Sequence, residues 1–151
     1  MKIPDVELYD LERNPINLTT FIGKKTIIAF FPGAFTGGCT EELCSFQSDL
    51  NQFNDLNVQV VGICVDSPFA LSGWAEANEI TFPLLSDYKK ECIKLFDVEF
   101  EGLAGMEGYI SSNRAVFISD ESGEVTYKWV AENPGILPDF DEIKNNIKKN
   151  I

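Results

Sequence analysis

The stretch TIIAFFPGAFTGGCTEELC, residues 26–44, runs from an apolar segment through a glycine-rich bend to a cysteine, with a second cysteine five residues later. Residues 24–31 and 58–65 are largely apolar runs, which are typical of strands buried on both faces of a sheet. Between them, apolar residues recur at steps of three and four, which predicts one helix of about four to five turns. These residues are Leu43, Phe46, Leu50, Phe53 and Leu56.

The segments that follow extend this strand–helix–strand unit. Ser67 is expected to cap a second helix that begins at Pro68, and Ser86 to cap a third helix. The remaining expected elements are a strand at 114–119, a turn at 120–123, a half-exposed strand at 124–130 and a last helix at 139–150.

This order of elements predicts a single domain, residues 1–151, with a thioredoxin-like α/β fold in which helices flank a central mixed β-sheet. A doubly wound parallel sheet is the competing interpretation. The sequence DESG at 120–123 disfavours it, because it predicts a hairpin and hairpins join antiparallel neighbours.

The charge of the chain limits its partners. The formal net charge is −12, with 12 lysine and arginine residues against 24 aspartate and glutamate residues. Phosphate binding needs clustered basic residues, so we expect neither nucleic acid nor an anionic membrane as a partner. The longest apolar stretch, residues 26–31, is too short to span a bilayer. No basic segment followed by an apolar run marks a signal peptide, and we expect a cytoplasmic protein.

The cysteine and histidine content narrows the chemistry. Cysteines stand at positions 39, 44, 64 and 92, and the chain has no histidine. In a reducing cytoplasm such cysteines are more often free, catalytic or metal-bound than paired in disulfides. The lack of imidazole excludes Cys–His pairs, Ser–His–Asp triads and histidine-containing zinc sites, and the cysteine spacing does not fit an all-cysteine zinc site. We therefore expect no metal and no cofactor.

Cys39 has the setting of a reactive thiol. It follows a buried strand and a bend, and it should lie in the first turn of the helix that comes next. A helix start carries partial positive charge and free N–H groups, which favour the thiolate over the thiol. Gly37 and Gly38 would let backbone N–H groups approach a substrate, and the hydroxyl of Thr36 could donate to the sulfur or position a polar substrate. Composition alone favours a buried core cysteine, and the bend shifts the interpretation towards a functional one.

Nearby acidic residues oppose a thiolate, so a cation is needed beside the sulfur. Glu41 and Glu42 follow Cys39 closely, and the chain has only two arginines, Arg13 and Arg114. Arg114 begins a predicted core strand. We therefore expect Arg114 to lie at the end of the sheet from which Cys39 emerges.

At these residues the sequence resembles the peroxiredoxin family of thiol peroxidases. The family signature Pro-x-x-x-Thr-x-x-Cys reads here as Pro32, Thr36 and Cys39, and the glutamate three residues after the cysteine is Glu42. The catalytic arginine of the family begins a strand, as Arg114 does. Two further segments that look similar are residues 80–87 and 133–135, so the resemblance covers most of the chain. It extends to two subgroups, the bacterioferritin comigratory proteins and alkyl hydroperoxide reductase E.

The resemblance implies a mechanism that needs no histidine. Cys39 would be the peroxidatic cysteine, which attacks a peroxide oxygen and becomes a sulfenic acid. Thr36 and backbone amides, with Gly38 in support, would hold the peroxide, and Arg114 would stabilise the thiolate and the developing charge. Pro32 would shield the thiolate from water. Glu42 belongs to the same family pattern as a supporting residue.

The resemblance leaves the role of Cys44 open. In the bacterioferritin comigratory subgroup a cysteine at this position resolves the sulfenic acid as a disulfide, whereas alkyl hydroperoxide reductase E proteins typically work with one catalytic cysteine. Five residues of α-helix rise about 7.5 Å and turn the side chains to different sides. A disulfide needs Cα atoms roughly 4.4–6.8 Å apart, so resolution by Cys44 requires the first turns of the helix to unwind. The alternative to a resolving role is that Cys44 is a structural residue packed in the core.

The remaining cysteines and several aromatic residues have more than one possible role. Cys64 is most simply a core residue, and Cys92 either a half-buried helix residue or a remote resolving cysteine. Trp74, Phe35 and Phe82 could line an apolar pocket or fill the core, with core favoured for Trp74. A thioredoxin-like disulfide exchanger and a non-catalytic redox sensor are the competing functions. The expected partners are a peroxide, a thiol reductant such as thioredoxin or a glutaredoxin-like protein, and a second copy in a homodimer.

Overall fold

The centre of the molecule is a seven-stranded mixed sheet. The computed structural model describes residues 1–149. The strands of this sheet are β1 Glu7–Tyr9, β2 Pro15–Asn17, β3 Lys25–Phe30, β4 Val58–Cys64, β5 Leu84–Ser86, β8 Ala115–Ser119 and β9 Val125–Val130. Their order is β2-β1-β5-β4-β3-β8-β9, with β3, β4 and β5 parallel and with β8 and β9 running antiparallel.

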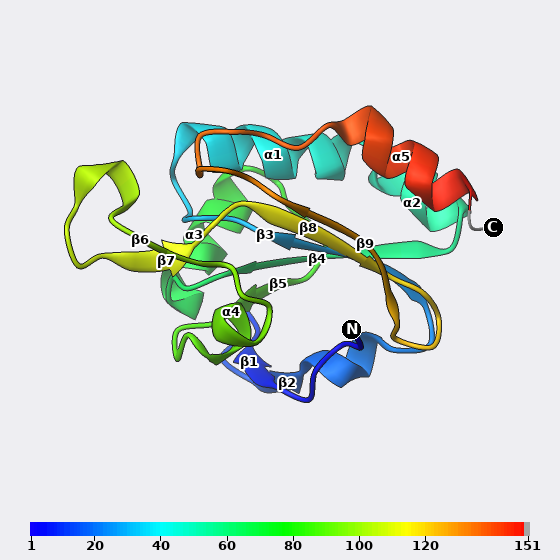
Figure 1. Ribbon diagram of the computed structural model, residues 1–151, viewed down its shortest axis with the longest axis horizontal. Coiled ribbons are helices and arrows are strands. Elements are labelled where there is room, and N and C mark those ends of the chain that lie inside the picture. Colours follow the sequence, from blue (N-terminus) through cyan, green and yellow to red (C-terminus); the bar gives the residue numbers. More distant parts are fainter. Residues whose placement is uncertain (150–151) are drawn as a thin grey trace.

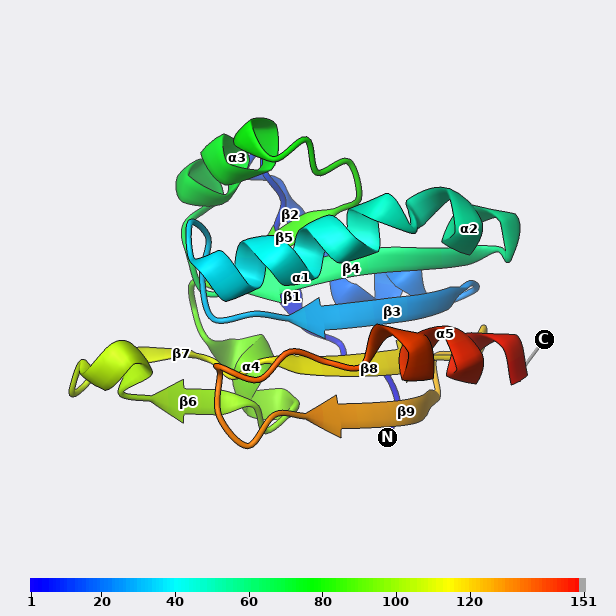
Figure 2. The same cartoon turned by 90° about the horizontal axis from the view of Figure 1, so that it is seen from above.

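Helices cover both faces of this sheet, as Figure 1 and Figure 2 show. The helices are α1 Gly37–Ser48, α2 Leu50–Asp55, α3 Pro68–Ala77, α4 Glu91–Leu95 and α5 Phe140–Lys149, with short 3-10 turns η1 Leu18–Phe21 and η2 Leu103–Gly105. One apolar core joins α1, α2, α3 and α5 to the sheet, and a second core lies on the other face beneath α4 and the N-terminal segment. A mixed sheet flanked by helices in this way confirms the predicted thioredoxin-like architecture.

The predicted strands agree with the structure to within a residue or two, and the turn at 120–123 joins β8 to β9 as an antiparallel hairpin. Five three-residue strands were not predicted: β1, β2, β5 and the separate hairpin of β6 Glu99–Glu101 with β7 Ile110–Ser112. Three residues are too few for a period-two pattern to stand out, so tertiary pairing alone reveals these strands.

The prediction of one helix across the first apolar stripe is wrong in one respect. The segment forms two helices, α1 and α2, which are separated at Asp49, where φ is −95° and ψ is 5°. The carboxylate of Asp49 pairs with Nζ of Lys144 at 2.9 Å, so the bend lies where the segment meets α5. The apolar stripe continues across the bend into the same core.

The predicted helix cap at Ser86 is also wrong. Ser86 lies in β5, and its hydroxyl donates to the carbonyl of Asp66. Asp87 stabilises the start of α4 instead, because its carboxylate accepts hydrogen bonds from the backbone N–H groups of Cys92 and Ile93. By contrast, the Ser67 cap before Pro68 is present as predicted, with its hydroxyl accepting from the N–H of Ala70.

The predicted last helix is present as α5, although Asn150, its expected final residue, lies outside the described residues. Within the described part of the chain, the helices are too short or too polar to cross a membrane.

The sheet register determines where the site forms. Phe30, the last residue of β3, lies opposite Ala115, the first residue of β8. The bend that follows β3 and the residue that precedes β8 therefore emerge at the same end of the sheet. This end brings Cys39 and Arg114 together from positions 75 residues apart.

Candidate active site

Cys39 lies at the start of α1. Thr36 is the N-cap residue, in extended conformation with φ of −101° and ψ of 147°, and Cys39 is the third residue of the helix. The first amides of a helix have no intrahelical acceptor, so they are available to donate beside the sulfur. The side chain of Cys39 is fully buried. The structure thus confirms the prediction that Cys39 lies in the first turn of the helix.

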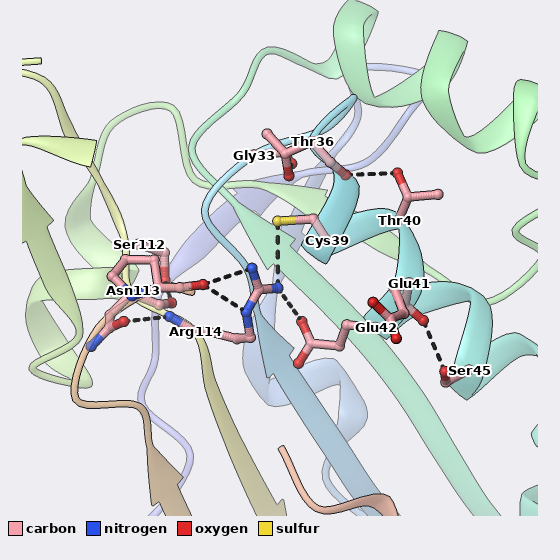
Figure 3. Close-up of polar contacts among 11 residues, drawn as sticks. Gly33, Thr36, Cys39, Thr40, Glu41, Glu42, Ser45, Ser112, Asn113 and Arg114 are labelled. Atoms are coloured by element: carbon pink, nitrogen blue, oxygen red, sulfur yellow. Dashed lines mark hydrogen bonds and ion pairs between the residues drawn. The ribbon is translucent and has the colours of Figure 1, made fainter. Parts of the chain in front are cut away.

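Arg114 points at the sulfur from the opposite side of the site (Figure 3). Its Nη1 atom lies 3.5 Å from Sγ of Cys39 and donates to Oε1 of Glu42 at 3.0 Å. Both ends of the ion pair are buried. One guanidinium therefore serves a thiol and a carboxyl at the same time.

The orientation of Arg114 comes from the main chain of a distant segment. Its Nε and Nη2 atoms both donate to the carbonyl of Pro134, at 3.1 and 2.9 Å. Its own N–H donates to the side-chain oxygen of Asn113, whose amide nitrogen donates to the carbonyl of Ala131. The role of Pro134 was missed by sequence reasoning, because a main-chain acceptor has no side-chain signature.

Glu42 is an unusual carboxyl because it is completely buried. Burial raises its pKa to about 8, although the charge of Arg114 and the hydrogen bond from Arg114 act to lower it. Among residues 1–149, Oε2 of Glu42 has no hydrogen-bond partner, which fits a carboxyl that is not fully compensated. The raised pKa favours the protonated form of the carboxyl, so Glu42 opposes a thiolate less than an ordinary glutamate would.

The exposed glutamate next to Glu42 and the two glycines before Cys39 lie in different surroundings. Glu41 is exposed on the outer side of α1. Gly38 faces the site, and a Cβ atom there would lie 3.0 Å from Nη2 of Arg114, so close that the guanidinium would have to shift. Gly37, in contrast, has open space around it. Of the two glycines, Gly38 is therefore the one that the approach of Arg114 requires.

The loop before α1 is held by its own hydrogen bonds. The hydroxyl of Thr36 donates to the carbonyl of Gly33 at 2.9 Å, so its single proton is not directed at Cys39 as the sequence had suggested. A hydroxyl oxygen that donates its proton keeps lone pairs with which it can accept a hydrogen bond. Pro32 is buried in the same loop.

Two residues that were not among the predicted catalytic residues, Asp66 and Trp74, hold this loop in place. Oδ2 of Asp66 accepts from the N–H of Ala34 at 2.7 Å. Trp74, fully buried as predicted for a core residue, donates from Nε1 to the hydroxyl of Thr40, which itself donates to the carbonyl of Thr36. Asp66 follows the carboxyl end of the parallel strand β4, a place where polar site residues often gather, so its position was a usable signal.

The other cysteines lie in different settings. Cys44 is half-buried and lines a second cleft of about 510 Å³ with Phe140 and Lys144 of α5, away from Arg114. Cys64 and Cys92 are fully buried, and Cys92 is more buried than its predicted half-buried state. Burial raises the pKa of both thiols above the ordinary cysteine value. Such thiols react slowly.

A cleft of about 660 Å³ adjoins the site. Pro32, Thr36, Gly38 and Arg114 form its inner end, and the hairpin of β6 and β7 forms its outer wall. A small polar reactant can therefore reach the guanidinium and the threonine from this side.

Comparison with known proteins agrees with this geometry. Residues 1–128 match the model of the AhpC/TSA family. The chain is 33% identical over 124 residues to a protein named as a peroxiredoxin in Mycobacterium tuberculosis, a match that covers 82% of this chain and 79% of that protein. It is 32% identical to peroxiredoxin Bcp of Escherichia coli, covering 82% and 80%. The crystal structure of peroxidoxin BcpB from Mycobacterium tuberculosis is similar with a TM-score of 0.81 at 26% identity, covering 97% and 91%.

A thioredoxin-like fold that holds a cysteine at a helix start against a buried arginine defines a thiol-dependent enzyme. With the sequence matches, the assignment is specific: the chain belongs to the AhpC/TSA family and is a peroxiredoxin, a thiol-dependent peroxidase.

Proposed function

We propose that Cys39 is the peroxidatic cysteine and that it reduces hydrogen peroxide and organic hydroperoxides. The observation that carries the proposal is the 3.5 Å contact between Sγ of Cys39 and Nη1 of Arg114, next to an open cleft. A guanidinium and a helix start both stabilise a thiolate, which is the nucleophilic form of cysteine.

The reaction is a displacement at oxygen. The thiolate attacks the terminal oxygen of the hydroperoxide, an S–O bond forms and the O–O bond breaks. The bonding pair leaves with the second oxygen, which takes up the proton released earlier by the thiol and departs as water or an alcohol. The sulfur loses two electrons and becomes a sulfenic acid.

The surrounding groups have complementary roles. The hydroxyl of Thr36, which donates to Gly33, can accept from the O–H of a hydroperoxide. Arg114 and the free amides of the first turn, where Gly38 leaves room for the guanidinium, stabilise charge on the two oxygens. Pro32 shields the sulfur from water.

We further propose that Cys44 resolves the sulfenic acid. Its thiol would condense with the oxidised Cys39, with formation of a disulfide and release of water. Because the two residues lie on one intact helix, α1, this step requires the first turns of α1 to unwind. The half-buried position of Cys44 supports its availability.

The cycle closes when an external dithiol reduces the disulfide, and we propose thioredoxin or a glutaredoxin-like protein for this step. A homodimer is supported by the exposed Phe35 beside the site. The four cysteines are free, which supports a reducing compartment, and we propose the cytoplasm.

The test is peroxide consumption by the purified protein with dithiothreitol as reductant. The wild type should consume hydrogen peroxide far faster than free cysteine does, and Cys39→Ser should abolish the activity although it keeps the other three thiols. A disulfide exchanger would reduce insulin disulfides without this peroxide consumption, and a sensor would be oxidised once without turnover. Either result would overturn the proposal.

The role of Cys44 has a separate test in the protein mass after one equivalent of peroxide. The wild type should lose two hydrogen atoms as an intramolecular disulfide forms, whereas Cys44→Ser should gain one oxygen atom. A wild type that also gains one oxygen atom would show that Cys44 does not resolve Cys39.

A further inference from the structure

The segment that follows β9 carries the carbonyl that orients Arg114. Residues 131–136 of this segment form neither helix nor strand. Within residues 1–149, every hydrogen bond that joins residues 131–136 to the rest of the chain involves Arg114 or its neighbour Asn113. The position of the Pro134 carbonyl therefore depends on these two residues.

The side chain of Asn113 bridges Arg114 and the segment after β9. Asn113 lies between β7 and β8 and is buried. Its Oδ1 atom accepts from the N–H of Arg114 at 2.8 Å, as Figure 3 shows, and its Nδ2 atom donates to the carbonyl of Ala131 at 2.8 Å. Its own N–H donates to the carbonyl of Val98 at 2.7 Å. A buried amide is costly unless its polar atoms are paired, and here both ends of the side chain are paired.

This bridge closes a ring of hydrogen bonds around Arg114. The carbonyl of Arg114 accepts from the N–H of Ala131 at 3.0 Å. Further along the same segment, the carbonyl of Pro134 accepts from Nε and Nη2 of the arginine, at 3.1 and 2.9 Å. The main chain and the guanidinium of Arg114 are thus both joined to one short segment. Asn113 supplies the link in this ring that Arg114 does not make itself.

The Pro134 carbonyl competes with Glu42 for the guanidinium. An arginine and a carboxylate commonly form two parallel hydrogen bonds. Here Nη1 of Arg114 donates to Oε1 of Glu42, whereas Oε2 has no hydrogen-bond partner among residues 1–149. If the Pro134 carbonyl moved away, a second N–H of the guanidinium could turn to this oxygen. The Nη1 atom would then leave its position 3.5 Å from Sγ of Cys39.

We propose that Asn113 is a positioning residue of the peroxidase reaction. Its amide holds Ala131 in place, and with it the carbonyl of Pro134. The guanidinium of Arg114 then stays directed at the sulfur of Cys39. Asparagine suits this bridge because its amide has a donor and an acceptor at the end of a short side chain. The proposal rests on the peroxidase function proposed for Cys39, and Asn113 acts only through Arg114.

The first experiment observes the guanidinium directly. Arg13 and Arg114 are the two arginines of the chain, so an ¹H–¹⁵N spectrum contains one Nε–H signal from each, and Arg13→Lys assigns them. In Asn113→Ala the Nε–H proton of Arg114 should exchange with water about fivefold faster, the factor that corresponds to one weakened hydrogen bond. The signal of Arg13 should stay as it is in the wild type.

The matched control is Asn17→Ala, on β2. Asn17 is also a bridging asparagine, because its Oδ1 atom accepts from the N–H of Thr19 and its Nδ2 atom donates to Asp5. Its loss should leave the exchange of the Arg114 proton unchanged. A second variant, Asn113→Asp, keeps the shape of the side chain and its acceptor, but an ionised aspartate cannot donate to Ala131. It should give the same result as Asn113→Ala.

The second experiment measures the oxidation of Cys39 by hydrogen peroxide in stopped flow. Asn113→Ala should react about tenfold more slowly, because a misplaced group at a reaction centre costs up to about 100-fold. In an Arg114→Lys background the further change Asn113→Ala should add no slowing, since the effect of Asn113 passes through the guanidinium. Asn17→Ala should react at the wild-type rate.

Three results would overturn the proposal: wild-type exchange of the Arg114 proton in Asn113→Ala, the same faster exchange in Asn17→Ala, or full additivity of Asn113→Ala and Arg114→Lys in the oxidation rate. Additivity would mean that Asn113 acts on the fold and not through the guanidinium. Failure of the peroxidase function itself looks different. Hydrogen peroxide would then not oxidise Cys39 in the wild type, while the effect of Asn113→Ala on the Arg114 signal would remain.

Discussion

At the scale of single residues, the guanidinium of Arg114 links the parts of the site. It contacts Sγ of Cys39, donates to Glu42 and donates twice to the carbonyl of Pro134. A planar fork can make these contacts together, whereas a lysine ammonium on a flexible stem cannot. The sequence predicted the meeting of Arg114 and Cys39 because strand order places them at one end of the sheet.

Arg114→Lys should therefore slow sulfenic acid formation by about 100-fold, since loss of one aligned donor in an oxyanion-type site costs that much. Stopped-flow fluorescence after mixing with hydrogen peroxide measures the rate, and near-ultraviolet circular dichroism checks the fold. Arg13→Lys, at the other arginine of the chain, is the control and should react at the wild-type rate. An unchanged rate in Arg114→Lys would remove the arginine from the reaction.

The buried Glu42 should make stability depend on pH. Its pKa in the folded protein is about 8, compared with an ordinary value of 4.5. Between these values the folded state keeps a proton that the unfolded state has lost, so the free energy of unfolding should fall as pH rises from about 5 to about 8.

Glu42→Gln should remove the contribution of Glu42 to this fall, because glutamine does not titrate. Chemical denaturation at several pH values measures the free energy of unfolding of the two proteins. Both proteins also carry Cys39→Ser, which excludes a contribution from that thiol. Parallel stability curves for the two proteins would contradict the raised pKa of Glu42.

At the scale of elements, α1 has to be stable enough to position Cys39 and unstable enough to release it. Gly37 lies in the first turn with open space around it, so an alanine there fits without a clash. Glycine within a helix lowers its stability by roughly 0.5–1 kcal/mol relative to alanine.

Gly37→Ala should therefore slow disulfide formation between Cys39 and Cys44 by about two- to fivefold, the factor that corresponds to this energy. Quenched samples analysed by mass spectrometry give the rate of that step apart from sulfenic acid formation. Ser48→Ala, at the far end of α1 beyond Cys44, strengthens turns that need not unwind and should leave the rate unchanged. Equal slowing in both variants would mean that the whole helix opens.

At the scale of the whole molecule, the loop between Pro32 and Thr36 presents an exposed aromatic residue, Phe35, at the surface beside the site. Phe35 is 66% exposed and adopts a φ of 62°, in the left-handed region that is unfavourable for a bulky side chain. An exposed aromatic side chain on a strained backbone is typical of an interaction site. The proposed homodimer would bury Phe35 in its interface.

Phe35→Asp should lower the fraction of dimer, because it places a charge in the interface while aspartate tolerates this backbone conformation. Sedimentation velocity over a range of protein concentrations measures the fraction. Phe69→Asp, at a residue that is 69% exposed beside Arg13, is the matched control and should leave the dimer unchanged. Equal dimer fractions in both variants and the wild type would place the interface elsewhere.

The sequence by itself determined the thioredoxin-like class and the position of Cys39, because both follow from local patterns: buried strands, an apolar helical stripe, and a glycine-rich bend before a helix. It could not place three-residue strands, the bend at Asp49 or the cap of α4 by Asp87, since each depends on contacts with other elements.

Only the tertiary structure decided the electrostatics of the site and the shape of the space next to it. The raised pKa of Glu42 depends on complete burial, and the orientation of Arg114 depends on the carbonyl of Pro134, 20 residues away. The outer wall of the cleft exists because the hairpin of β6 and β7 projects beyond the main sheet (Figure 2). Burial, main-chain acceptors and projecting segments arise from packing between distant parts of the chain. Local sequence patterns therefore do not predict them.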